Sequence, residues 1–253
     1  MHKAWAALVY AFLYLPLVVV VAFSFNDSRL NAGWSGFTWH WYQVLLHDRQ
    51  MLTAAGNSLL IALFSSLIAT LLGTMAGIAI HRYDFKLLNY LALTPVAMPE
   101  VLLGVSLLLF YLQVLNLTLG ILSVVLAHVT FSIGFVAVVV RAALAALDDS
   151  LVEAAHDLGA GNWQTFRHIT YPLILPAVIA GELMAFTLSL DDFVITFFTA
   201  GVGVPTLPLH IYSMIRTAVT PEVNAVSSLL MLLTLTLILL ASKLAPDSLK
   251  DRS

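Results

Sequence analysis

The chain has 253 residues, of which 60% are hydrophobic and 10% are charged, and its formal net charge is -3. Soluble domains carry roughly 45–50% apolar and about 25% charged residues, so this composition excludes a water-soluble or disordered protein and predicts a membrane protein. The lack of cysteine excludes a disulfide framework, a thiolate metal site and a cysteine nucleophile, and the scattered basic residues argue against nucleic-acid binding.

Six apolar runs are long enough to cross a bilayer, which takes roughly 20 residues of helix. The runs are continuous and do not alternate between apolar and polar residues, which is typical of helices and not of a membrane β-barrel. The sequence therefore predicts an all-α integral membrane protein with one domain over residues 1–253. The predicted spans cover approximately residues 4–25, 57–80, 87–113, 118–140, 173–199 and 223–241.

The Lys and Arg residues outside these spans predict the orientation of the chain, because cytoplasmic loops carry the excess of them. With both termini in the cytoplasm, eight of the 11 Lys and Arg residues lie on that side and three lie outside. The sequence therefore predicts cytoplasmic N and C termini.

The predicted outer loop over residues 26–56 is rich in aromatic residues. Amphipathic rings favour the headgroup level of a membrane, so an interfacial belt is one interpretation. The alternative is that one or more of these rings, Trp41 among them, lines the outer mouth of a transport pathway.

All charged residues within the predicted spans are acidic, and they are Glu100, Glu182, Asp191 and Asp192. A carboxylate at the centre of a membrane helix costs roughly 2.5–3.5 kcal/mol, which favours a buried or water-lined position over a lipid-facing one. Because no Lys or Arg lies in any span, a route lined by these acids would favour cations.

Structural roles for the same acids stay open. Asp191 and Asp192 could cap a broken helix or reach water near the outer end of their span. Glu100 follows Pro99, and Pro95 lies one turn earlier, so we expect the helix to break or kink there.

Other residues within the spans favour packing roles. Glu182 lies beside small residues, where a hydrogen bond between helices is as good an interpretation as a ligand role. His128 is alone in its span and is expected to be a hydrogen-bonded packing residue, not a metal ligand. Gly73 and Gly77 form a G-x-x-x-G motif, which favours close helix packing. No hydrolase, metalloprotease or phosphate-loop motif is present, so we expect no enzyme activity, metal or cofactor in this chain.

The segment over residues 142–172 predicts two short helices on the cytoplasmic side. Asp148 and its neighbours favour a helix start, an apolar stripe follows, and Gly159 permits the left-handed turn that ends the helix. A short amphipathic helix without a core of its own is expected to dock in a groove of a partner. The alternative, a helix on lipid headgroups, is disfavoured because Arg167 is the one basic residue within residues 142–172 apart from His.

This segment resembles the EAA loop of permease subunits in bacterial ATP-binding-cassette (ABC) importers. That signature is E-A-A, three residues, Gly, nine residues, then I-x-L-P. Here E-A-A stands at 153–155, Gly at 159, Ile at 169 and Pro at 172. Tyr171 replaces the usual Leu, which is a conservative apolar change.

Further motifs resemble the spermidine/putrescine (PotC-like) permease group along nearly the whole chain. They are S-F-N at 24–26, W-x-G-F-T at 34–38, A-H-V-T-F at 127–131, F-T-L-S-L-D-D at 186–192, L-P-L at 207–209 with I-Y-S at 211–213, and P-E-V-N-A at 221–225.

The resemblance implies a type I ABC importer (MetI-like) permease fold in the bacterial inner membrane, with six transmembrane helices. It implies a polyamine importer in which this subunit forms half of the pathway beside a second homologous (PotB-like) permease. Two partner ATPase subunits would bind ATP and Mg and dock on the EAA loop, and a periplasmic binding protein would deliver the substrate.

The resemblance also implies roles for particular residues. The substrate pathway would involve Trp41, Glu100, Ser189, Asp191 and Asp192. Coupling to the ATPase would involve Glu153, Ala154, Ala155, Leu158 and Gly159.

Two alternatives remain. One is an importer of the same class for another small solute, such as a phosphonate, an amine or a metal complex. The other is a proton-coupled secondary transporter that uses Glu100 or the Asp pair.

Overall fold

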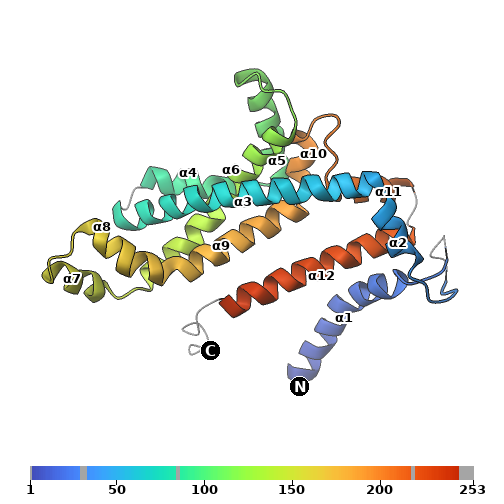
Figure 1. Cartoon of the computed structure of the whole chain (residues 1–253), viewed down its shortest axis with the longest axis horizontal. Coiled ribbons are helices and arrows are strands. Elements are labelled where there is room, and N and C mark those ends of the chain that lie inside the picture. The colour runs from blue at the N-terminus through green and yellow to red at the C-terminus, as the bar shows by residue number, and fades with distance from the viewer. Residues whose placement is uncertain (1, 29–32, 84–85, 218–219, 245–253) are drawn as a thin grey trace. The chain divides into compact units, whose positions relative to one another are not determined.

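The computed structural model describes residues 2–28, 33–83, 86–217 and 220–244, and these residues contain helices and no strand. One isolated β-bridge joins Asn26 to Phe37. The all-α membrane fold is therefore confirmed. The helices (Figure 1) are α1 (His2–Phe23), α2 (His40–His47), α3 (Arg49–Tyr83), α4 (Lys86–Ala97), α5 (Glu100–Leu109), the π-helical turn η1 (Phe110–Val114), α6 (Ile121–Ala145), α7 (Asp149–Asp157), α8 (Asn162–Thr165), the π-helical turn η2 (Phe166–Thr170), α9 (Tyr171–Asp191), α10 (Val194–Thr199), α11 (Leu207–Thr217) and α12 (Pro221–Leu244).

Four helical segments are long and apolar enough to cross a membrane unaided, and they cover Trp5–Phe23, Arg49–Tyr83, Ile121–Ala145 and Asn162–Asp191. Helix α4 and the segment Glu100–Val114 are together apolar enough for a fifth crossing, but they are bent by 111° at a short break, so they form a broken span or a re-entrant loop. The sixth predicted span falls on α12, whose apolar part Pro221–Leu237 is shorter. The count of six spans, the cytoplasmic termini and the single domain stay predictions.

The helices differ from the predicted spans in three places. The helix that contains the second predicted span begins at Arg49, and α2 occupies part of the predicted outer loop. Helix already precedes residue 173, where the fifth predicted span begins, because it continues from α8 through η2 into α9. The fifth span is also interrupted, because α9 ends at Asp191 and α10 begins at Val194.

The break between α4 and α5 is where the two prolines predicted it. Pro95 lies inside α4, and Pro99 precedes α5 with extended backbone at φ -57° and ψ 131°. Proline has no backbone N–H and disfavours helix in the residue before it, so the chain leaves the helix at this point. Glu100 thereby becomes the first residue of α5.

The contacts divide the chain into two compact units, and each is described by itself. Unit 1 comprises residues 1–56 and 205–236. Its core joins α2, the start of α3, α11 and α12 through Trp41, Leu45, Met51, Leu207, Ala225 and Val226.

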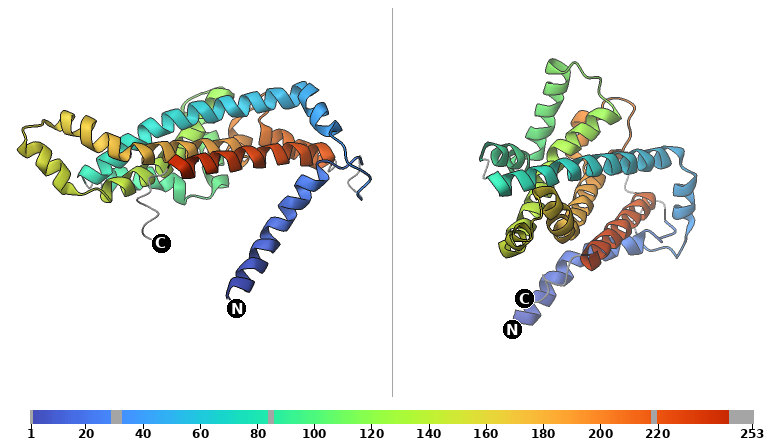
Figure 2. Two further views of the ribbon diagram at one scale, coloured as in Figure 1. Left: turned by 60° about the horizontal axis from the view of Figure 1, so that its bottom comes forward. Right: turned by 60° about the vertical axis from the view of Figure 1, so that its left-hand side comes forward.

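Unit 2 comprises residues 57–204 and 237–253. Within it α6 packs along α9 and against α4, and α5 packs against α10 (Figures 1 and 2). The G-x-x-x-G motif packs α3 closely on α6, since a Cβ added at Gly73 would lie 2.6 Å from Val136 Cβ and one at Gly77 would lie 2.9 Å from the Ala137 carbonyl oxygen. The predicted packing role of this motif is therefore confirmed.

Candidate functional site

Asp192 lies in the break between α9 and α10. Its backbone is extended, at φ -65° and ψ 123°. Its carboxylate accepts hydrogen bonds from the backbone N–H groups of Ile195 at 3.3 Å and Thr196 at 2.7 Å, and from the Thr196 hydroxyl at 2.8 Å. These N–H groups belong to the first turn of α10 and have no partner inside that helix. Asp192 therefore caps a broken helix, which was one of the two interpretations of the acidic pair.

His128 on α6 joins this cap to the neighbouring helices. Its Nε2 lies 3.2 Å from Asp192 Oδ2 and 3.0 Å from Thr196 Oγ1, and its Nδ1 lies 2.6 Å from Ser189 Oγ. Ser189 in turn accepts a hydrogen bond of 2.9 Å from the Ser65 hydroxyl on α3. We call these five residues, Ser65, His128, Ser189, Asp192 and Thr196, the His128 network.

The His128 network is buried within unit 2. His128 is 2% exposed, and Ser65, Ser189 and Thr196 are all buried. The hydrogen bonds of His128 confirm the expectation that it is a hydrogen-bonded residue inside its helix bundle. Its contact with Asp192 was not predicted, because the two residues are far apart in the sequence.

The two adjacent aspartates have different surroundings. The side chain of Asp192 is 6% exposed, whereas Asp191 is exposed at the end of α9. Glu100 is also exposed, and its charge acts on Asp191 because α5 packs against α10. Asp191 and Glu100 thus form an exposed acidic surface next to the buried network. Glu182 is half-buried on α9, one residue after the buried Gly181.

Trp41 lies in the first turn of α2, within unit 1. It is 7% exposed, and its indole Nε1 donates a 2.7 Å hydrogen bond to the backbone oxygen of Asn26. The other aromatic residues of this region, Trp34, Phe37 and Trp39, are largely exposed and lie around Phe23 and Phe25. An interfacial belt describes these exposed rings, but it does not describe the buried Trp41.

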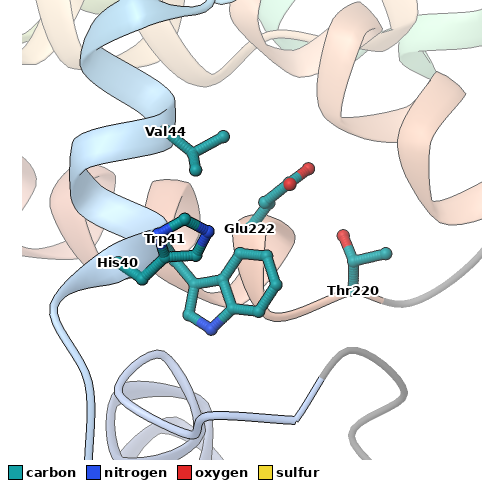
Figure 3. Close-up of a pocket in the computed structure, with 5 residues that line it drawn as sticks. All are labelled: His40, Trp41, Val44, Thr220 and Glu222. Carbon is teal, nitrogen blue, oxygen red and sulfur yellow. The ribbon is translucent and has the colours of Figure 1, made fainter.

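A cavity of about 290 Å³ lies beside Trp41 and is lined by His40, Trp41, Val44, Thr220 and Glu222 (Figure 3). Glu222 comes from the first turn of α12, and the buried Thr220 hydroxyl has no hydrogen-bond partner among the described residues. A carboxylate, a free hydroxyl oxygen and an aromatic ring are groups that bind an ammonium ion. Glu222 was not singled out from the sequence, although it lies in the P-E-V-N-A motif.

The first predicted short helix of the segment over residues 142–172 is α7, and the second begins at Asn162 as α8 but continues through η2 into α9. Their cytoplasmic position stays a prediction. Asp148 accepts a 3.0 Å hydrogen bond from the backbone N–H of Ser150, which caps α7 and lowers the pKa of the Asp148 carboxyl. Gly159 has φ +85°, the left-handed conformation that favours glycine. The segment projects from the end of unit 2 where α6 ends and α9 begins (Figure 2).

The residues of the expected coupling surface lie on this segment. The side chain of Ala155 is buried, whereas Glu153, Ala154 and Gly159 are exposed and Leu158 is 90% exposed. Leu158 follows the last residue of α7, and a short amphipathic helix that ends in an exposed leucine supports the expected docking of a partner.

Sequence comparisons identify a family and several relatives of this chain. The family model described as "Binding-protein-dependent transport system inner membrane component" matches residues 69–251. The spermidine/putrescine transport system permease protein PotC of Haemophilus influenzae is 39% identical over 244 residues, covering 95% of each chain. The PotC protein of Escherichia coli K12 is 38% identical over 248 residues, covering 97% of this chain and 94% of its own. The putrescine transport system permease protein PotI of Escherichia coli K12 is 42% identical over 231 residues, covering 88% of this chain and 82% of its own.

Solved structures support the fold. A bacterial ABC transporter that imports the acidic polysaccharide alginate matches with a TM-score of 0.74 at 17% identity, covering 96% of this chain and 93% of its own. The inward-facing MetNI methionine ABC transporter matches with a TM-score of 0.66 at 17% identity, covering 76% of this chain and 93% of its own. The expected type I ABC importer permease fold is therefore confirmed.

Proposed function

The chain belongs to the family of binding-protein-dependent transport system inner membrane components, and we propose that it is the permease subunit of an ATP-driven importer of polyamines such as spermidine and putrescine. The observation that carries the proposal is its 38–42% identity, over most of both chains, to permeases named for transport of these amines. Membership of this family makes the chain a multi-pass inner-membrane protein that is homologous to transporter permease subunits.

The exposed acidic surface in unit 2 supports a cationic substrate. Polyamines are linear cations, and carboxylates in a water-lined membrane path attract cations in preference to anions. Glu100 and Asp191 provide such carboxylates. Ser189 and Asp192 belong to the buried network, so we propose that they contribute to the pathway by holding its wall.

The cavity beside Trp41 supports a role for this residue in the pathway. Trp41 is held in place by its hydrogen bond to Asn26, so its ring can form one fixed wall for an ammonium group, and Glu222 supplies the opposite charge. We expect E222Q to lower polyamine uptake about threefold at low substrate concentration, since a partly exposed charge contact contributes about 0.5–1 kcal/mol. Initial uptake rates over a range of concentrations test this, and unchanged rates at all of them would contradict it.

We propose three kinds of partner. A second homologous permease subunit would complete the pathway, and a periplasmic binding protein would deliver the polyamine. Two ATPase subunits would bind and hydrolyse ATP with Mg and dock on Glu153, Ala154 and Leu158, which α7 leaves exposed.

Replacing both aspartates tests the proposed function. We expect D191N/D192N to abolish uptake of radiolabelled spermidine and putrescine by membrane vesicles that contain the assembled transporter. The subunits should still co-purify, because neither residue lies on α7. Full uptake by the double variant would contradict the pathway role. Uptake that fails on collapse of the proton gradient and resists vanadate would indicate a secondary transporter instead.

A further inference from the structure

The carboxylate of Asp192 is bound mainly by groups of the protein, three of them on Oδ2 and one on Oδ1. Four donor groups surround it: two backbone N–H groups of α10, the Thr196 hydroxyl and His128 Nε2. A carboxylate has about four lone-pair sites, so few remain for a passing cation. Asp191, the adjacent residue, has none of these contacts and is exposed.

The neighbouring hydroxyl groups decide which nitrogen of His128 donates a hydrogen bond and which accepts one. The Thr196 hydroxyl gives its proton to Asp192 Oδ2, so His128 Nε2 faces two acceptors and carries a proton itself. In the neutral imidazole, Nδ1 then accepts from the Ser189 hydroxyl, and Ser189 accepts from Ser65. Every proton in the chain from Ser65 to Asp192 therefore has an acceptor, which rigidifies a buried network.

The His128 network connects four helices at the break between α9 and α10. Ser65 lies on α3, His128 on α6, Ser189 on α9 and Thr196 on α10. Apart from the backbone, His128 provides the side-chain link of the network between Ser189 at the end of α9 and Asp192 in the break. The exposed Asp191 lies between these two residues in the sequence.

We propose that His128 is a positioning residue: it holds Asp192 in the break between α9 and α10, so that, of the two aspartates, Asp191 presents its carboxylate to the cation. The assignment of a cation as the passing species rests on the proposed function. The division of the acidic pair into a buried structural aspartate and an exposed contact aspartate rests on the geometry alone.

Cysteine labelling tests this division without any assumption about the substrate. The chain has no cysteine, so a single introduced thiol reports on its own position. Because reaction of a thiol requires access to it, we expect a water-soluble cationic methanethiosulfonate to label D191C about tenfold faster than D192C in the assembled transporter. Equal rates, or faster labelling of D192C, would overturn the proposal.

Conservative variants of His128 test its role through Asp192. The glutamine amide of H128Q reaches toward the position of Nε2, whereas the shorter asparagine amide of H128N reaches only toward that of Nδ1. We expect H128A and H128N to lower polyamine uptake about tenfold, as for loss of a hydrogen bond to a charged group, and H128Q to retain most uptake. A role in packing alone predicts no advantage of H128Q over H128N, and that result would overturn the proposal.

A double-mutant cycle completes the test. If His128 acts through Asp192, the H128A/D192N variant should be no worse than the poorer single variant. Losses that multiply would show that His128 acts elsewhere. S132A is the matched control, because Ser132 is buried one turn along α6 and its hydroxyl has no hydrogen-bond partner among the described residues. Wild-type vesicles that take up no polyamine would contradict the proposed function, while the labelling experiment would still decide the division of the acidic pair.

Discussion

Two of the predicted spans contain a helix break, and the two breaks have different causes. Between α4 and α5 the backbone itself prevents helix, because Pro99 has no N–H to donate. Between α9 and α10 no proline or glycine is present, and the side chain of Asp192 holds the break by hydrogen bonds to Thr196 and His128. Each break places a carboxylate at a helix end, Glu100 at one and Asp191 at the other. The break that the proline backbone makes depends on the local sequence, and we call it the backbone-made break. The break that the hydrogen bonds of Asp192 make depends on the surrounding fold, and we call it the side-chain-made break.

The largest effect is expected at the side-chain-made break. D192A leaves the buried donors of Thr196 and His128 without an acceptor, and we expect it to destabilise the protein by about 3 kcal/mol. The melting temperature of the purified transporter and the yield of assembled complex measure this. D192N is the matched variant, because its side-chain oxygen still accepts hydrogen bonds, and it should be less destabilised. Equal stability of D192A and the wild type would show that the break needs no side-chain cap.

A smaller effect is expected at Gly159, where the backbone also makes the turn. With φ +85°, a substituted alanine costs about 1–2 kcal/mol of strain, which would displace the coupling surface on α7. We expect G159A to retain basal ATP hydrolysis by the complex but to lose polyamine-stimulated hydrolysis and uptake.

The matched control for Gly159 is G161A. Gly161 has φ -76°, which alanine adopts freely, and open space surrounds the position where its Cβ would lie. This variant should be fully active. If G159A and G161A behaved alike, the left-handed turn would not be needed for coupling. Substitution of Glu153, which is exposed on the same surface, should uncouple the ATPase without altering the turn.

The smallest effect is expected at Pro99. P99A increases the freedom of the unfolded chain, which costs about 0.4–1 kcal/mol, and it removes no hydrogen bond, since proline has no N–H to donate. Thermal unfolding of P99A beside D192A measures the contrast between the two breaks. A larger loss in P99A than in D192A would reverse the comparison.

The sequence predicted the features that depend on local chemistry. The prolines predicted the first break, Asp148 predicted the start of α7, and Gly159 predicted its end. The acidic content of the spans and the EAA signature predicted the class of protein. These signals were sufficient because each acts over a few residues or is a recognisable motif.

The second break was only one of two interpretations of the acidic pair, because the contact that decides between them joins Asp192 to a residue that is distant in the sequence. A run of apolar residues from 173 to 199 continues through the break, and the lone His128 gave no sign that its partner was Asp192. Packing of α6 along α9 brings them together. In the same way, the burial of Trp41 depends on the backbone of Asn26, fifteen residues earlier.

The 35 residues of α3 have a further consequence. At 1.5 Å per residue the helix is about 52 Å long, whereas the hydrocarbon core of a bilayer is about 30 Å thick. Its terminal arginines, Arg49 and Arg82, therefore cannot both lie at the edges of the hydrocarbon unless the helix is steeply tilted. Unless it is steeply tilted, the helix extends beyond the hydrocarbon into the headgroups or the water, and a thinner or thicker bilayer is expected to change its tilt and not its length.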